Sequence, residues 1–348
     1  MPKKVKMIFC LAACFGVIFT FLPRPALAEA GKPVAAAVDG ENVWVTDNSN
    51  HQLVRLRASD GSLIAAYPVS SPLRMLHDGI NVWTVSNAGI VTKVRAKDGV
   101  VLASYPAGGP ASGIAFDGEN VWVSNPESDK VTKIRASDGS IVGSYTVGKS
   151  PDGLLFDGKF IWVADSGANT VTKVRPSDGS RAATYTVGDN PAEFAFDGQN
   201  IWVTNYGSHT VTKLRSGDGS VIGTYSVGKF PRGIVFDKAN IWVTDYGDNK
   251  VTKLRASDGT VVGAYNVGRD PAEITFDGSN IWVINYGSGN LMKIKPADGS
   301  TIGTFSLAGH ANPQPSSSKN IKNPGKLKAR RGFRFWGRAE ADRDTRRI

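Results

Sequence analysis

Cysteine is nearly absent from the sequence, and its position makes this scarcity informative. The 348 residues contain two cysteines, Cys10 and Cys14, and both lie within the first 28 residues. That segment has the layout of a secretory signal peptide, with basic positions, an apolar run that ends at Leu22, and a small-x-small cleavage pattern that ends at Ala28. After cleavage there, the remaining chain has no disulfide, no thiol nucleophile and no cysteine ligand for a metal.

The same segment contains the signature of a second processing route. Residues 11–14, Leu-Ala-Ala-Cys, resemble the lipobox of bacterial lipoproteins. A lipoprotein should turn polar after that cysteine, whereas here the apolar run continues to Leu22. We therefore expect export by cleavage after Ala28, to the periplasm or the extracellular space, with lipidation of Cys14 as the alternative.

Helical patterning is also missing. No window long enough for a helix has apolar residues at a spacing of 3.6. A unit of about forty residues recurs instead, and its clearest copy is 191–228. The tryptophan of this unit returns seven times, with spacings of 39, 39, 40, 40, 40 and 40, at Trp44, Trp83, Trp122, Trp162, Trp202, Trp242 and Trp282.

Each copy contains four short β-patterns separated by turns. In the copy at 191–228, an Asp-Gly pair follows the first and the third of them. Seven such units predict an all-β fold, a seven-bladed β-propeller of four-stranded antiparallel blades with about 40 residues per blade. Both faces of a blade carry apolar residues, so closure into a ring buries faces that an open stack would expose. We expect each terminus to complete its own blade.

The excess of basic residues does not belong to the repeats. The formal net charge is +10, but residues 309–348 hold 11 Lys and Arg against 3 Asp and Glu. This stretch has neither period nor turn pattern, so we predict a signal peptide at 1–28, a propeller at 29–308 and a disordered basic tail at 309–348. The tail would either contact anionic surfaces or have no partner, and the near-neutral propeller is not expected to bind nucleic acid.

The repeated words FDGxNIWVTNYGSxTVTKLR resemble bacterial NHL/YVTN-type propeller repeats and, more distantly, the streptogramin B lyase family. The resemblance covers 29–308 and implies a seven-bladed propeller, a fold that hosts binding proteins, lactonases and lyases. In the lyases it implies a metal-dependent site with a histidine–glutamate cluster above the axis, and a second-strand word that ends in glutamate. The matching positions here are Asp47, Ser86, Asn125, Asp165, Asn205, Asp245 and Asn285.

Residues that recur in every blade are interpreted as structural. The tryptophans should pack between blades, and the Asp/Asn positions that end the second strand should cap turns. Two basic rings on the third strand should pair with the aspartates of the Asp-Gly turns. The first ring is Arg55, Lys93, Lys133, Lys173, Lys213, Lys253 and Lys293, and the second is Arg57, Arg95, Arg135, Arg175, Arg215, Arg255 and Lys295.

Departures from the repeat are the candidates for a functional site. At the entrance of the first strand, nearest the axis, the series is Ala35, Arg74, Gly113, Gly153, Glu193, Gly233 and Glu273. We predict a ligand-binding mouth on the face opposite the Asp-Gly turns, formed by blades five to seven. Its candidate residues are Glu193, Glu273, Arg232, Tyr206, Tyr246, Tyr286 and His209. The alternative is a solvated rim in which Arg232 neutralises the two glutamates.

No set of catalytic or metal-ligating residues emerges from the repeat. The first functional hypothesis is therefore an exported, monomeric, non-catalytic binding or scaffold module without a cofactor, whose partner is a small molecule or a cell-surface component. The second is a lyase or lactonase that uses a divalent metal and depends on Glu193, Glu273 and His209. The third is a structural protein of the cell envelope.

Overall fold

The computed structural model describes residues 31–307, and every regular element in that range is a β-strand. The expected signal peptide at 1–28, with Cys14, and the expected basic tail at 309–348 lie outside the described residues. Between residues 31 and 307 there is no helix with the length and apolarity to cross a membrane.

Seven sheets, each of four antiparallel strands in chain order, form seven blades. The first strands are β1 (Pro33–Val38), β5 (Pro72–His77), β9 (Ile114–Phe116), β13 (Pro151–Phe156), β17 (Pro191–Phe196), β21 (Pro231–Phe236) and β25 (Pro271–Phe276). The second strands are β2 (Asn42–Asp47), β6 (Asn81–Ser86), β10 (Asn120–Asn125), β14 (Ile161–Asp165), β18 (Asn200–Asn205), β22 (Asn240–Asp245) and β26 (Ile281–Asn285). The third strands are β3 (Gln52–Arg57), β7 (Ile90–Arg95), β11 (Lys130–Arg135), β15 (Thr170–Val174), β19 (Thr210–Arg215), β23 (Lys250–Arg255) and β27 (Asn290–Ile294). The fourth strands are β4 (Leu63–Pro68), β8 (Val101–Pro106), β12 (Ile141–Thr146), β16 (Arg181–Thr186), β20 (Val221–Ser226), β24 (Val261–Asn266) and β28 (Thr301–Ser306).

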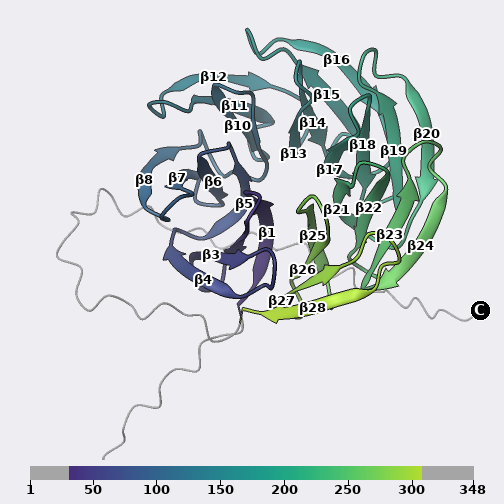
Figure 1. Ribbon diagram of the computed structural model, residues 1–348. Coiled ribbons are helices and arrows are strands. Elements are labelled where there is room, and N and C mark those ends of the chain that lie inside the picture. Colours follow the sequence, from purple (N-terminus) through teal and green to yellow (C-terminus); the bar gives the residue numbers. More distant parts are fainter. Residues whose placement is uncertain (1–30, 308–348) are drawn as a thin grey trace, which may run out of the picture. The chain divides into compact units, whose positions relative to one another are not determined.

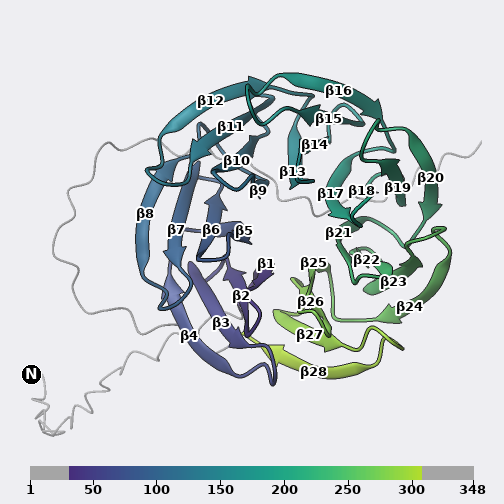
Figure 2. The ribbon, with the colours of Figure 1, turned by 45° about the horizontal axis from the view of Figure 1, so that its top comes forward.

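The blades close into a ring, which confirms the predicted seven-bladed propeller. The first strands surround the central axis and the fourth strands form the perimeter, as Figures 1 and 2 show. Neighbouring first strands contact one another around the whole ring, including β1 with β25. The sheets β1–β4 and β25–β28 each use consecutive strands, so the ring closes without strand exchange, as predicted.

The repeated tryptophans pack between blades, as the sequence indicated. All seven are fully buried, and each joins an apolar cluster with the following blade; Trp282 of blade seven packs with Val43 and Leu56 of blade one. Each indole nitrogen donates a hydrogen bond to the aspartate of the first turn in its own blade, as Trp202 does to Asp197 at 2.8 Å; this turn is Asp-Gly in six blades and Asp237-Lys238 in blade six. The tryptophan therefore fixes the turn and the blade interface together.

The second Asp-Gly turn makes room for the neighbouring blade. Gly219 has a φ of +75°, which disfavours a side chain, and a Cβ there would lie 1.9 Å from the ring of Tyr185 in the preceding blade. Gly61 has the same relation to Phe305 across the junction of blades one and seven. The aromatic residue of the fourth strand and the glycine of the next blade thus form one repeated contact.

The prediction for the basic rings is correct for one ring and wrong for the other. Arginines of the second ring pair with the aspartate three residues later in their own blade, as Arg255 does with Asp258 at 3.0 Å. Lysines of the first ring are buried beside the tryptophans and donate instead to backbone carbonyls of the next blade, as Lys253 does to Pro296 at 2.6 Å. The first-turn aspartates are occupied by the indole N–H groups, which leaves the carbonyls as acceptors.

Candidate functional site

A bulge at the start of the first strand aims side chains toward the axis. In blade five, Pro191 pairs with Asn205 and Phe194 pairs with Val203, so Ala192 and Glu193 both lie opposite Thr204. Such an extra residue bends the strand and changes the direction of its side chains. The Thr204 hydroxyl accepts a hydrogen bond from the Glu193 amide at 3.0 Å and donates one to the carbonyl of Arg232 in blade six at 2.8 Å. Neighbouring bulges are thereby joined around the axis.

Arg74 of blade two bridges the two glutamates predicted for the site. Its guanidinium contacts Glu193 of blade five at 2.6 Å and also forms an ion pair with Glu273 of blade seven. The three side chains are 11%, 17% and 15% exposed. Arg74 and Glu273 are 199 residues apart in sequence, so this contact exists only because the ring closes. The direct ionic partner of both glutamates is thus Arg74, and not Arg232 as in the alternative of a solvated rim; Arg232 makes only a smaller electrostatic contribution to Glu193.

Glycines in the preceding blades create the space for both glutamates. A Cβ on Gly153 of blade four would lie 2.9 Å from a carboxylate oxygen of Glu193, and a Cβ on Gly233 of blade six would lie 2.8 Å from one of Glu273. Neither glycine has a positive φ in the structure, so close packing rather than turn geometry requires them. The alternation of Gly and Glu at the strand entrance is therefore a steric pairing between adjacent blades.

An axial cavity of about 160 Å³ lies at this cluster. Arg74, Glu193 and Glu273 line it together with apolar and small residues of the first strands, among them Met75 and Leu154. In blade four, Asp152 lies one residue before Gly153, which is the equivalent of Glu193. The Asp152 carboxylate accepts a hydrogen bond from the Ser112 hydroxyl of blade three. Five blades thus contribute a polar or charged side chain to the axial end of the mouth.

Burial and crowding of carboxylates dominate the electrostatics of this cluster. Burial raises the pKa of Glu193, the carboxylates of Glu273 and Asp152 raise it further, and Arg74 lowers it, so that it is raised to about 8. Burial lowers the pKa of Arg74, but the carboxylates of Glu193 and Glu273 raise it, and the net shift is upward. One guanidinium is shared between two carboxyl groups, so its own charge is stabilised, whereas the charged form of Glu193 is disfavoured.

Arg232 lies among the tyrosines instead of in this ion-pair cluster. Its guanidinium is 5.8 Å from the ring centroid of Tyr246. Burial raises the pKa of Tyr206 and of Tyr246, and Arg232 lowers both. The carboxylate of Asp270 and, to a smaller extent, Tyr206 and Tyr286 also raise the pKa of Tyr246. At the same loop position the other blades have Asn48, Asn87, Pro126 and Ser166, so blades five to seven alone carry an aromatic arc there.

His209 contacts a neighbouring loop and does not line the axial cavity. Its Nδ1 accepts a hydrogen bond from the Phe230 amide at 3.1 Å, and its ring packs edge-on against Phe230 at 4.8 Å. Asn169 and Asn249 accept the matching amide hydrogen bond in blades four and six. His209, with a φ of +59°, thus takes over a loop-capping function, and Phe230 in turn contacts Tyr206 at 5.0 Å.

The structure therefore brings the candidate residues together in two groups. Glu193 and Glu273 lie in the axial cluster, whereas Arg232 lies with Tyr206, Tyr246 and Tyr286 at the adjoining rim. Asp152 and Ser112 were missed by the sequence argument. The signal that could have found them is the series one residue earlier, which reads Val34, Leu73, Ser112, Asp152, Ala192, Arg232 and Ala272.

The donor set of this region was also tested for a metal. Among the residues that the structure describes, no three His, Cys, Asp or Glu side chains are arranged to hold a metal ion. Glu193 and Glu273 are the nearest approach to such a set, and Arg74 occupies the position between them.

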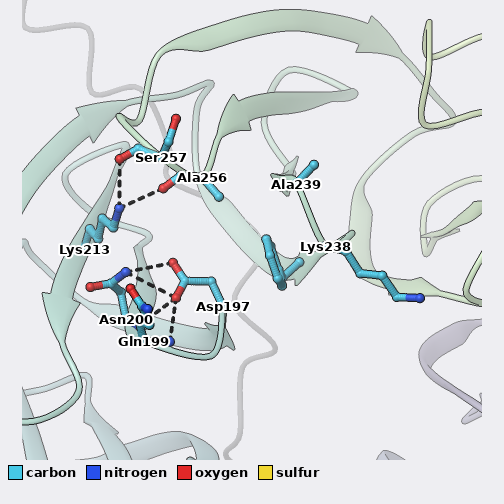
Figure 3. Close-up of a pocket in the computed structure, with 9 residues that line it drawn as sticks. Asp197, Gln199, Asn200, Lys213, Lys238, Ala239, Ala256 and Ser257 are labelled. Atoms are coloured by element: carbon cyan, nitrogen blue, oxygen red, sulfur yellow. Dashed lines mark hydrogen bonds between the residues drawn. The ribbon is translucent and has the colours of Figure 1, made fainter.

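A second cavity, of about 360 Å³, lies on the Asp-Gly turn face between blades five and six (Figure 3). Lys213 points to the carbonyls of Ala256 and Ser257, at 2.7 and 3.3 Å, and Asp197 is held by the side chain of Asn200. Both arrangements recur in other blades, so the polar groups of this cavity are part of the repeated blade interface.

Comparison with known proteins shows the fold of this chain and assigns it to no family. A family model described as outer membrane protein assembly factor BamB matches residues 23–145. No curated protein matches the chain. A structure titled "Streptogramin B lyase structure" is 20% identical, covers 74% of this chain and 91% of its own, and has a TM-score of 0.65.

Hydrazine synthase of Kuenenia stuttgartiensis is another similar structure. It is 16% identical, covers 79% of this chain and 99% of its own, and has a TM-score of 0.68. At these identities the similarity shows the propeller fold alone. The similarity to the streptogramin B lyase structure confirms the resemblance in fold that the repeated sequence words indicated.

Proposed function

We propose that this chain is an exported, non-catalytic binding propeller that holds its ligand at the axial mouth opposite the Asp-Gly turns. The observation that carries the proposal is the convergence of the charged residues that break the sevenfold repeat. Arg74, Glu193 and Glu273 come from three different blades and line one axial cavity, and Asp152 of a fourth blade contributes to the electrostatics of Glu193. Ligand sites combine a concave shape with a few convergent polar groups, and this end of the ring has both.

The state of these side chains favours binding over catalysis. Arg74 already engages both glutamates, and His209 uses Nδ1 to hold a loop amide. A general base must be free to reach a proton of the substrate, whereas a binding site benefits from side chains that are held in place. Export is part of the proposal because residues 1–28 have the pattern of a secretory signal.

One observation favours a second candidate, an enzyme of lyase or lactonase type. The pKa of Glu193 is raised to about 8, chiefly by burial, so this carboxyl group would carry a proton near neutral pH. A buried acid with such a pKa is suited to proton transfer. The candidate makes Glu193 a proton donor to a leaving group, and it requires Arg74 to release that carboxylate when substrate binds.

A thermal-shift screen of the full chain against small metabolites tests the proposal. A ligand of the mouth should raise the melting temperature of the native chain and lose that effect with Glu193→Gln, which leaves Glu273 as a partner for Arg74. Glu127→Gln is the matched control, because Glu127 is an exposed residue on a loop of blade three. A ligand that stabilises both variants equally would place binding elsewhere and contradict the proposal.

The same variants separate binding from catalysis. The native chain is incubated with lactones and cyclic depsipeptides, and the products are measured by mass spectrometry, with and without added divalent metal. Turnover that is lost with Glu193→Gln would favour the enzyme. Binding of these compounds without turnover would favour the binding module.

A further inference from the structure

The outer layer of the mouth carries two opposite charges, each without an ionic partner in the ring. Asp152 accepts a hydrogen bond from Ser112, and Arg232 lies over the ring of Tyr246. Within residues 31–307, neither side chain has an oppositely charged group within ion-pairing distance. This layer differs from the layer below it, where Arg74, Glu193 and Glu273 satisfy one another.

Both charges occupy the same position of the first strand in different blades. Asp152 is the second residue of β13 in blade four, and Arg232 is the second residue of β21 in blade six. Blade five, which lies between them, has the small residue Ala192 at that position. The Asp152 carboxylate contacts Ser112 of blade three, and the Arg232 carbonyl accepts a hydrogen bond from Thr204 of blade five, so the first strands are close together at this level of the ring.

We propose that the mouth binds a small zwitterion, with its ammonium group against Asp152 and its carboxylate against Arg232. This inference rests on the proposed binding function and specifies the ligand class. Charge-assisted hydrogen bonds to both ends would fix the orientation of the ligand. The tyrosines around Arg232 would contact the carbon chain between the two charged groups.

Ligands with a single charge fit this mouth less well. A simple anion at Arg232 would leave Asp152 without a cationic partner, and a simple cation at Asp152 would leave Arg232 without an anionic one. A zwitterion presents a favourable charge to each side. The two charged positions flank a single blade, which indicates a small compound, about the size of an amino acid.

Calorimetric titration of the full chain tests this inference with zwitterions of increasing length. The probes are glycine, β-alanine, γ-aminobutyrate and ε-aminocaproate, and the comparison compounds with one charge are caproate and hexylamine. We expect one length to bind at least about tenfold more tightly than either comparison compound. Asp152→Asn and Arg232→Gln should each weaken that binding by about 10- to 100-fold.

Two kinds of control keep the result interpretable. Glu127→Gln and Arg269→Gln remove exposed charges elsewhere on the loop face and should leave the affinity unchanged. Arg232→Lys keeps the charge and should restore most of the affinity lost in Arg232→Gln, whereas a purely structural effect of Arg232 on the rim would persist in both. Circular dichroism confirms that each variant is folded.

The outcomes distinguish this inference from the function on which it rests. Equal binding of the zwitterions and the compounds with one charge, or no zwitterion binding at millimolar concentration, would overturn the zwitterion inference. The binding function would survive either result if another ligand still depended on Glu193. Zwitterion binding that is insensitive to both Asp152→Asn and Arg232→Gln would overturn the assignment of the two charged positions.

Discussion

The two ends of the ring are built on opposite principles. On the Asp-Gly turn face, each blade repeats the same contacts: the indole to the turn aspartate, the aromatic ring over the next glycine, and the basic side chain to a carbonyl of the next blade. On the opposite face, the blades differ at the axis, where an arginine, three carboxylates and a serine come from separate blades.

This difference separates what holds the ring from what the ring presents. A contact that is repeated in all seven blades helps to close the ring and does not indicate where a ligand binds. A residue that occurs once gains nothing from the repeat, so a separate interaction must compensate for its burial. The following predictions test this division, from the largest expected effect to the smallest.

Removing the bridge across the axis should have the largest effect. Arg74→Met leaves two largely buried carboxylates without their shared cation, so we expect the free energy of unfolding to fall by about 3–5 kcal/mol at pH 8.5. The loss should shrink at pH 5, where Glu193, whose pKa is raised to about 8, is protonated and no longer needs the guanidinium. Urea denaturation at both pH values measures it.

A second-site change provides the control for this variant. Adding Glu193→Gln and Glu273→Gln to Arg74→Met should recover much of the lost stability, because the unpaired charges are removed. If Arg74→Met were equally destabilising at both pH values and in the triple variant, the cluster would act through packing instead of charge.

The two Asp-Gly turns of blade five provide a matched pair of glycines. Both Gly198 and Gly219 have positive φ, but a Cβ on Gly198 meets nothing within 4 Å, whereas one on Gly219 overlaps the ring of Tyr185. Gly198→Ala should lower the free energy of unfolding by about 1–2 kcal/mol through backbone strain alone. Gly219→Ala should lower it by about 2–4 kcal/mol because the blade contact is also disturbed. Equal losses would show that the aromatic–glycine contact does not help to hold adjacent blades together.

The buried lysine ring should contribute a smaller amount per position. Lys213→Met keeps the apolar stem over Trp202 but leaves the carbonyls of Ala256 and Ser257 without their donor. We expect the free energy of unfolding to fall by about 1–3 kcal/mol. Lys250→Met, at an exposed lysine of β23, should change it by less than about 0.5 kcal/mol. A similar effect at both positions would remove the distinction between the ring lysine and a surface lysine.

The smallest expected effect is a gain. Burial raises the pKa of Asp245 to about 7, although Thr252 and the Gly228 amide donate hydrogen bonds to it. The folded state therefore holds a proton that the unfolded chain releases near pH 4, and this contribution to stability is lost as the pH rises toward 7. Asp245→Asn should raise the melting temperature at pH 7.5 by about 2–4 °C and weaken its dependence on pH between 4 and 7.

Asn205 supports that expectation, because it occupies the equivalent position and donates a hydrogen bond to Thr212 at 2.8 Å. Differential scanning calorimetry from pH 4 to 8 compares the two chains. An unchanged pH profile would mean that Asp245 is ionised in the folded state throughout this range.

The repeated features of the fold could be predicted because each depends on residues close together in sequence. The Asp-Gly pairs specify tight turns, and Trp202 lies five residues from the aspartate that accepts its hydrogen bond. The pairing near the axis is less regular. β17 begins at Pro191, and its bulge keeps two irregular residues within the strand.

The candidate site could be predicted only in part. Glu193 and Glu273 were found as departures from the repeat, but the only partner considered for them was Arg232, in the alternative of a solvated rim. In the ring, the long side chain of Arg74 spans the axis from blade two, while Arg232 turns toward Tyr246. Position in the repeat identifies which residues approach the axis, but it does not show which of them meet across it.

By itself, the sequence determined the number of blades, their four strands, the turns between them and the aromatic contacts that repeat around the ring. These depend on local periodicity and turn chemistry, which neighbouring residues specify. Tertiary structure alone decided that Arg74 bridges Glu193 and Glu273, that Gly153 and Gly233 make room for them, and that Asp152 and Arg232 remain without ionic partners in the ring. Ring closure is the physical reason, because it brings first strands from every blade to one axis, where rotamers and packing across long sequence separations choose the contacts.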